Sequence, residues 1–307
     1  MGPSSVQASL DAMITNTMTP QDRIAPLLTG YADAVARRRR SFVLGVTILL
    51  LAILLAGWMA EVDLGVFFQN VHKFPNYIGR IFLLDSGEMN GRFVLFDVQG
   101  WYWGLSKWLI KLAETLLIAY VATLLGAIGG FFLCFLAASN LGVSRPVLFI
   151  TRRFLEFCRT VPELVFALIF VIAFGLGPMA GVLALALHTL GALGKLFYEV
   201  LENIDQKPVE GLIANGGSWS KTMRFAVLPQ VVSNFLSYAL LRFEVNVRGA
   251  SIMGFVGAGG IGQDLIEAVR KFYYPDISAI LVLIILTVFI IDLVTERLRH
   301  RFIPQAN

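Results

Sequence analysis

Long runs of uncharged, mostly apolar residues alternate with polar connections along this chain. The first run covers residues 41–60 and directly follows a basic block, Arg37–Arg40. A helix needs about 20 apolar residues to cross a bilayer, so this run predicts a first membrane span. Because it is too long for a signal-peptide core and lacks an obvious small-residue cleavage site, we expect it to be retained.

The same pattern recurs and predicts an all-α membrane protein with about six transmembrane helices. Besides the first and an irregular third, the spans are expected at about 115–144, 179–201, 231–254 and 277–295. Between the second and fourth, the apolar run 164–174 is too short to cross a bilayer alone. Either the third span starts inside the charged stretch 147–163, shielded by protein, or the run forms a short helix that ends at a Gly-Leu-Gly-Pro turn.

Composition supports this interpretation. Of the 307 residues, 57% are hydrophobic and 15% charged, whereas a soluble domain has about 45–50% and about 25%. These values exclude a disordered chain, a nucleic-acid-binding domain and a typical cytosolic enzyme. The two cysteines, Cys134 and Cys158, have neither the number nor the spacing of a metal site or a disulfide framework.

The basic residues predict how the chain is oriented. With six spans, 15 Lys and Arg residues fall on the side of the two termini and 7 on the opposite side. Cytoplasmic loops of membrane proteins carry the excess of positive charge, so we expect both termini in the cytoplasm.

The connection 203–230, between the fourth and fifth spans, holds the most informative motif. It contains Glu210, Ala214 and Gly216, and after nine further residues the run 226–229, Ala-Val-Leu-Pro. Pro208 can stand in the first turn of a helix, and glycine at 216 permits a turn without Cβ crowding. The motif therefore predicts a helix, a turn and the entry into the next span.

This spacing resembles the cytoplasmic signature of ABC importer permeases, which reads Glu-Ala-Ala, three residues, Gly, nine residues, Ile, one residue, Leu-Pro. Residues 211, 212 and 226 depart from that pattern, and the positions that carry it are Glu210, Ala214, Gly216, Leu228 and Pro229. In that family the segment is a short helix–turn–helix that docks into a groove of the ATPase subunit. The resemblance implies that these residues couple the chain to an ATPase.

Further segments resemble the phosphonate transporter permeases within that group. They are 159–167, 175–185, 242–248 and 254–262, and the resemblance spans about 110–302. It implies a type I, methionine-importer-like permease in a bacterial inner membrane. The implied partners are two ATPase subunits that hold ATP and Mg, a periplasmic phosphonate-binding protein, and a second permease chain, identical or different. The chain itself is expected to bind no cofactor, metal or nucleic acid.

The expected domain organisation follows from the spans and the resemblance. It comprises a cytoplasmic N-terminal segment at 1–40, the first helix at 41–60, a periplasmic or interfacial segment at 61–111 and a permease core at 112–302.

Charged and polar residues inside the predicted spans are candidates for the solute path, because intramembrane charges are costly and tend to mark pathways. Arg242 has no acid at helical spacing, whereas Glu244 and Arg248 stand four residues apart and can neutralise each other. Counting outward from Pro229 puts Arg242 mid-span and Arg248 nearer the outer mouth. His188 is either a packing residue or a further solute contact. Glu163, at a predicted helix start, suits an N-terminal capping role.

A glycine-rich stretch, 257–262, matches the dinucleotide pattern G-x-G-x-x-G, but no βαβ unit surrounds it. The resemblance places Gly257, Gly259 and Gly260 near the outer mouth of the path. The chain has no phosphate-binding G-x-x-x-x-G-K-[ST] loop, so we expect it not to hydrolyse ATP and not to be an enzyme.

Three alternatives remain open at this stage. The first is an importer of similar build for another small oxyanion, such as phosphite or a phosphate ester. The second is a membrane-embedded enzyme acting on lipid phosphates, which would need acids, His or Ser gathered at one membrane face; the histidines at 72, 188 and 300 are far apart. The third is a stand-alone secondary transporter, against which the docking motif argues.

Overall fold

The computed structural model describes residues 20–84 and 91–302. Within those ranges the chain is helical, with an isolated antiparallel bridge between Leu83 and Phe93. It divides into two units, Met1–Phe74 and Pro75–Asn307. Of the predicted N-terminal segment 1–40, residues 1–19 lie outside the described part of the chain.

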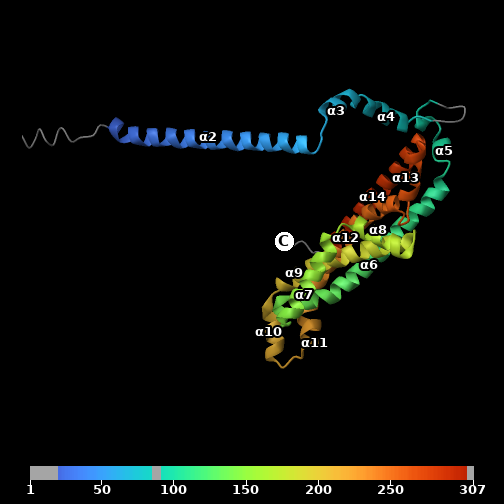
Figure 1. Ribbon diagram of the computed structural model, residues 1–307. Helices are drawn as coiled ribbons and strands as arrows, with labels where there is room; N and C mark the ends of the chain where they lie inside the picture. The colour runs from blue at the N-terminus through green and yellow to red at the C-terminus, as the bar shows by residue number, and fades with distance from the viewer. Residues whose placement is uncertain (1–19, 85–90, 303–307) are drawn as a thin grey trace, which may run out of the picture. The chain divides into compact units, whose positions relative to one another are not determined.

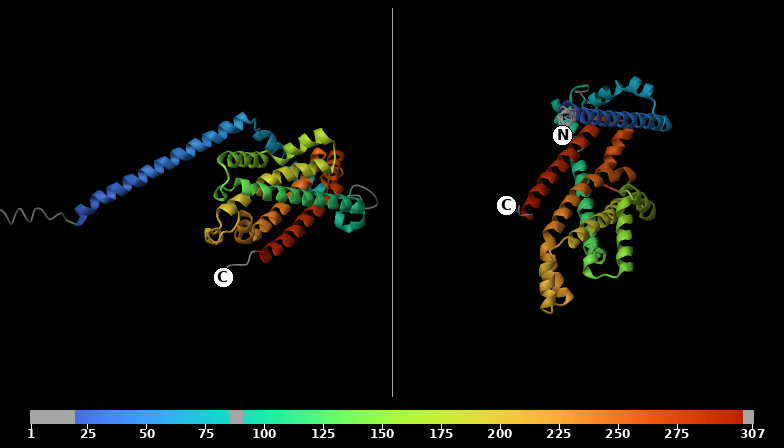
Figure 2. Two further views of the ribbon diagram at one scale, coloured as in Figure 1. Left: turned by 90° about the horizontal axis from the view of Figure 1, so that it is seen from below. Right: turned by 90° about the vertical axis from the view of Figure 1, so that its left-hand side faces the viewer.

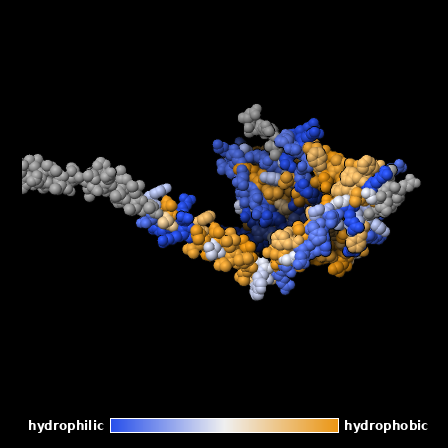
Figure 3. Space-filling view, turned by 90° about the horizontal axis from the view of Figure 1, so that it is seen from above, coloured by the Kyte–Doolittle hydropathy of each residue, from blue (hydrophilic) through white to orange (hydrophobic). Residues whose placement is uncertain are grey.

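The first unit is dominated by one long helix, α2 (Pro20–Met59), followed by the short α3 (Leu64–Asn70). The stretch Asp33–Met59 is long and apolar enough to cross a membrane, which agrees with the predicted first span. Past its basic block this helix is almost uniformly hydrophobic on the visible face (Figure 3). Apolar side chains exposed along a helix of this length suit contact with lipid.

The second unit is a helical bundle in which segments far apart in sequence lie side by side (Figures 1 and 2). Its elements, starting with a helix that crosses the unit boundary, are α4 (Lys73–Ile81), η1 (Val94–Phe96), α5 (Val98–Trp101), α6 (Leu105–Ala137), η2 (Ser139–Leu141), α7 (Arg145–Thr160), α8 (Glu163–Phe174), α9 (Pro178–Glu202), α10 (Gln206–Ala214), α11 (Trp219–Thr222), η3 (Met223–Val227), α12 (Leu228–Met253), η4 (Gly254–Val256), α13 (Gly262–Lys271) and α14 (Tyr274–Phe302). The bundle thus has one end formed by α10 and α11 and another formed by α5 and α13, named here the α10 end and the α13 end (Figure 1).

Four helices among the described residues are long and apolar enough to span a membrane: α2, α6, α9 and α14. The pair α7 and α8 adds a fifth candidate, bent by 89° at the break between them. Both possibilities for the third span have a counterpart, since α8 is a short helix and the charged α7 before it forms with it a candidate broken span. The predicted fifth span is a helix, α12, but it falls outside that count because polar and charged residues interrupt its apolar sequence.

Small residues allow α6 and α9 to pack closely along much of their length. A Cβ added at Gly130 would lie 2.9 Å from the backbone nitrogen of Gly194, and one at Gly126 would lie 2.6 Å from Thr189 Cγ2. Without a hydrophobic driving force inside a bilayer, close backbone approach of this kind is a main source of helix association.

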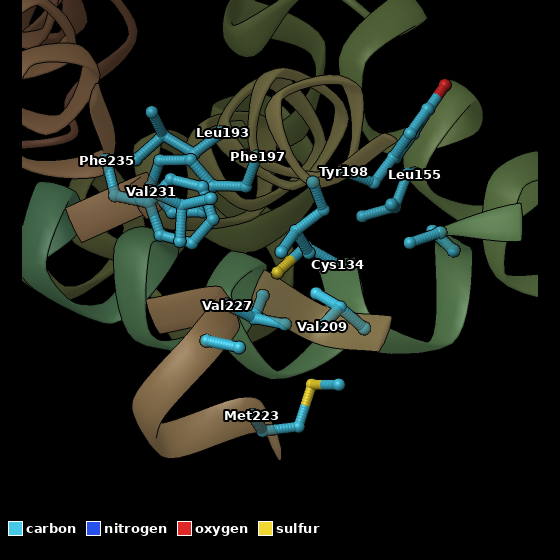
Figure 4. Close-up of a cluster of buried hydrophobic side chains, with 14 residues drawn as sticks. Cys134, Leu155, Leu193, Phe197, Tyr198, Val209, Met223, Val227, Val231 and Phe235 are labelled. Carbon is cyan, nitrogen blue, oxygen red and sulfur yellow. The ribbon is translucent and has the colours of Figure 1, made fainter. Parts of the chain in front are cut away.

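Two apolar clusters stabilise the ends of the bundle. At the α10 end, α9 and α12 meet through stacked Phe197 and Phe235, whose ring centroids are 4.1 Å apart (Figure 4). At the α13 end, buried Trp101 and Trp108 belong to one cluster with residues of α13 and α14. The unit that contains this second cluster begins at Pro75, and the expected limits of the permease core, 112–302, stay a prediction.

Candidate functional site

The residues singled out from the sequence fall into several regions. The first is the turn segment, defined here as residues 205–229 at the α10 end. Asp205 caps α10, its carboxylate accepting a hydrogen bond of 3.0 Å from the backbone N–H of Lys207. Pro208 stands in the first turn, as expected, and the buried Val209 anchors the helix in the apolar cluster of Figure 4. One side of α10 is therefore packed against the bundle through Val209, and the opposite side is exposed.

A glycine turn ends α10. Gly216 has a φ of +76°, which is the left-handed region that favours glycine. The N–H of Gly216 donates to Ile213 O and the N–H of Gly217 donates to Leu212 O, both at 2.9 Å. These bonds satisfy carbonyls that the helix end would otherwise leave without partners.

The solvent side of the turn segment presents both polar and large apolar groups. Glu210, Ala214 and Gly216 are exposed. Trp219 and Phe225 are also exposed, at 61% and 63% of their surface. Exposed apolar side chains gathered on one projecting segment are typical of a protein interface. The motif residues and these two aromatic residues thus lie on one projecting segment with an accessible surface.

The passage from the turn segment into α12 is not a plain helix start. A π-helical turn, η3, precedes Leu228, and Pro229 stands in the first turn of α12. Proline lacks an N–H and its ring crowds the carbonyl four residues earlier, which favours a locally widened turn. Leu228 is half-buried and Pro229 exposed.

The second region is the interior polar cluster, a set of side chains from four helices inside the bundle. Its members are Thr123 of α6, Glu163 of α8, His188 and Thr189 of α9, and Arg242 and Asn246 of α12. Asn246 and Thr189 are fully buried. In a membrane protein such a cluster is a candidate for the solute pathway, because each polar group is costly there.

Hydrogen bonds link the neutral members of the cluster. The amide nitrogen of Asn246 donates to Thr123 Oγ1 at 2.8 Å and to Thr189 Oγ1 at 2.9 Å. Arg242 Nε donates to the same Thr189 hydroxyl at 3.3 Å. The guanidinium of Arg242 is therefore positioned by a chain of uncharged groups that runs from α12 to α6 and α9.

His188 and Glu163 lie at the other side of the guanidinium. Arg242 Nη2 is hydrogen-bonded to His188 Nδ1. Since a guanidinium only donates, Nδ1 must accept, and the proton of the neutral ring is then on Nε2. The carboxylate of Glu163 lies 3.8 Å from Arg242 Nη2 and 3.6 Å from His188 Nδ1. Glu163, considered from the sequence only as a capping residue, is thus the acid that Arg242 lacks on its own helix.

The other charged pair of α12 is a separate group. Arg248 Nη2 and Glu244 Oε1 are 2.5 Å apart, so the expected pair exists in the structure. Arg299 of α14 adds a second cation, with its Nη2 3.6 Å from Glu244 Oε2. Glu244 is nearly buried and Arg248 half-exposed, and their ion pairs lead to Arg299 of α14 and not to the interior polar cluster.

The glycine-rich stretch forms the tight connection between α12 and α13. Gly257, Gly259 and Gly260 all have φ values near +80°, at +80°, +88° and +78°. A Cβ at Gly260 would lie 2.6 Å from Thr115 Oγ1, and the N–H of Ile261 donates to that hydroxyl at 2.9 Å. Gly260 therefore serves a close contact with α6, whereas Gly257 lies against Leu176 and Gly259 against Pro178 and Glu114. No group of metal-ligating side chains is found among the residues described.

Sequence reasoning proposed Arg242, Glu244, Arg248 and His188 as path residues. The structure brings Arg242 and His188 together in the interior polar cluster, and it pairs Glu244 with Arg248 as a separate group. It adds Thr123, Thr189 and Asn246, which were missed. Asn246 follows Arg242 by four residues, so helical spacing was a usable signal, whereas no spacing could connect residues of α6, α8 and α9 with α12.

Comparison with known proteins identifies the family. A family model described as binding-protein-dependent transport system inner membrane component matches residues 130–306. The phosphite transport system permease protein PtxC of Stutzerimonas stutzeri is 38% identical over 199 residues, covering 65% of this chain and 72% of that protein. A putative cryptic phosphonate transport system permease protein of Escherichia coli is 49% identical over 121 residues, covering 39% of this chain and 99% of that protein.

The fold also has a counterpart among solved structures. A chain from inward-facing crystals of the MetNI methionine ABC transporter superposes with a TM-score of 0.56 at 20% identity, covering 64% of this chain and 96% of that chain. The predicted methionine-importer-like fold is confirmed, as is the expectation of a permease subunit without enzymatic activity. Because the matched component is binding-protein-dependent, it works with a binding protein and an ATPase. The chain thus belongs to the inner membrane components of binding-protein-dependent transport systems, as a multi-pass permease subunit of an ABC importer.

Proposed function

We propose that this permease imports phosphonates or closely related phosphorus oxyanions. The observation that supports this substrate class best is Arg242, a guanidinium positioned inside the bundle by three uncharged side chains. Its planar fork of donors suits the oxygens of a phosphonate. The names of the two relatives, which describe phosphite and phosphonate transport, support the same chemistry.

An anion that crosses a low-dielectric bundle needs fixed positive charge along its way, because burying an unpaired charge is strongly unfavourable. Arg242 provides one such point in this model of transport, with the neutral ring of His188 beside it as a further solute contact. Arg248, half-exposed and shared with Glu244, provides a second when the pair opens. Gly257, Gly259 and Gly260 stand near the outer mouth in the same proposal.

The proposed assembly has two such permease chains, most simply two copies of this one. Two ATPase subunits, which bind ATP and Mg, contact the turn segments, and this chain binds no cofactor of its own. Both termini lie in the cytoplasm, as the distribution of basic residues indicates. Glu210, Ala214, Gly216, Leu228 and Pro229 form the coupling surface, to which exposed Trp219 and Phe225 are added.

The test is uptake of radiolabelled methylphosphonate by proteoliposomes that contain the whole transporter and its binding protein. Arg242→Gln should lower uptake by more than about tenfold, since a charge-assisted hydrogen bond is worth about 1.5–3 kcal/mol. Arg242→Lys should retain a reduced rate, because it keeps the charge and loses the fork. Arg153→Gln is the matched control, since Arg153 is exposed on α7. Wild-type uptake by Arg242→Gln would refute a charge-selective role for this residue.

Phosphite is the second candidate substrate, and the relative PtxC is the observation that favours it. Binding of methylphosphonate, phosphite and a phosphate ester to the isolated binding protein distinguishes the candidates. The compound bound most tightly should also drive the fastest uptake.

A further inference from the structure

Glu163 makes a loose ion pair inside the interior polar cluster. Its carboxylate lies 3.8 Å from Arg242 Nη2, which is beyond hydrogen-bond distance. Glu244 and Arg248, in contrast, are 2.5 Å apart. Glu163 is also 29% exposed, whereas Glu244 is 11% exposed. The carboxylate is therefore near enough to neutralise Arg242 and loose enough to leave it.

The local backbone allows this carboxylate to approach and to move. The chain bends by 89° between α7 and α8, and Glu163 is the first residue after the bend. On the facing helix, Gly249 leaves room for it, because an added Cβ would lie 3.0 Å from Glu163 Oε1. A larger residue there would press on the carboxylate.

Arg242, by contrast, keeps its position without Glu163. Its Nε donates to Thr189, its Nη2 to His188, and both of these residues belong to α9. Departure of the carboxylate would leave these neutral contacts intact and the charge of the guanidinium unopposed. An oxyanion arriving at that point would replace one anion by another.

Resting on the proposed function, we propose that Glu163 is an exchangeable counter-anion of Arg242. In the empty path Glu163 neutralises the guanidinium, and the arriving oxyanion displaces it. A solute with several anionic oxygens can engage both the fork and the neighbouring donors, whereas a monatomic anion such as chloride cannot. Glu163 thus makes the site selective for solutes that compete with a carboxylate, and its return to Arg242 expels the solute.

Equilibrium binding to the purified permease–ATPase complex, with the binding protein omitted and methylphosphonate as the probe, tests this idea. Glu163→Gln should tighten binding by more than about tenfold, because one competing charge near 4 Å is removed. The maximal uptake rate should fall in the same variant, since the solute is no longer expelled. A merely structural role would lower uptake without tightening the binding. Glu199→Gln, which removes an exposed carboxylate paired with Lys195 on α9, is the matched control and should change neither quantity.

Further variants cover the remaining outcomes. Glu163→Asp keeps the charge but shortens its reach, so its affinity should lie between wild type and Glu163→Gln. The double variant with Arg242→Gln should lose the tightened binding. Unchanged or weaker binding by folded Glu163→Gln, or by Glu163→Asp if the first does not assemble, overturns the inference. If Arg242-dependent binding persists while Glu163 has no influence, only this inference fails; absence of binding by every variant refutes the proposed function as well.

Discussion

The turn at Gly216 offers a direct test of coupling to the ATPase. Gly216 has a φ of +76°, and a Cβ added there would meet no heavy atom within 4 Å. The cost of a side chain is therefore purely conformational. For an L-residue the left-handed conformation costs about 1–2 kcal/mol, with β-branched residues at the unfavourable end. Gly216→Val should thus depopulate the native turn by about five- to thirtyfold, since 1.4 kcal/mol corresponds to a factor of ten.

The assay is the ratio of solute imported to ATP hydrolysed in proteoliposomes. In Gly216→Val that ratio should fall by an amount comparable with the loss of native turn, while membrane insertion stays intact. Gly216→Asn is the matched control, because asparagine tolerates the left-handed region and should couple far better than valine. Equal coupling by glycine, asparagine and valine at this position would refute the argument from backbone conformation.

Two further predictions concern packing and topology. Gly130→Ala should destabilise the bundle by about 1–3 kcal/mol through overpacking against the Gly194 backbone. Thermal unfolding in detergent measures this loss. Gly211→Ala, in open space on α10, should instead be neutral or stabilising, because alanine is the better helix former by about 1 kcal/mol. Equal stability of the two variants would contradict the packing argument. For the topology, single cysteines are placed at the exposed positions Asn215 and Val269 in a background without Cys134 and Cys158. They should react with an impermeant thiol reagent from opposite sides of the membrane. Labelling of both from one side would reject the proposed orientation.

Features that depend on neighbours in sequence were predictable. Apolar runs of sufficient length predicted the helices that contain 41–59, 115–137, 179–201 and 277–295, because a helix in a bilayer satisfies all its backbone groups internally. The turn at Gly216 and the position of Pro229 at the start of α12 follow from the backbone properties of glycine and proline. Gly211, where the motif departs from the family's alanine, faces open space, so no close contact requires a glycine and an alanine would fit there.

Features that depend on the tertiary arrangement were not predictable. The sharp bend before Glu163 brings an acid from α8 to Arg242 of α12, and neither residue indicates the other in the sequence. Asp205, in contrast, was missed although its signal is local, since an Asp directly before a helix with Pro208 in the first turn is a usual N-cap. The π-helical turn before Pro229 was missed because a proline permits both a clean start and a widened turn.

The level of the charged residues of α12 also depends on its neighbours. Arg299, in the last turn of α14, contacts Glu244, which is 16 residues after the start of α12. At 1.5 Å per residue, the part of α12 from Leu228 to Glu244 is about 24 Å long, and it lies on the α10 side of this contact. Counting from Pro229 alone predicts Arg242 in mid-span, and that position stays a prediction. The contact of Glu244 with the charged last turn of α14 favours a level nearer the edge of the apolar layer, where a guanidinium costs less than at the centre of a bilayer.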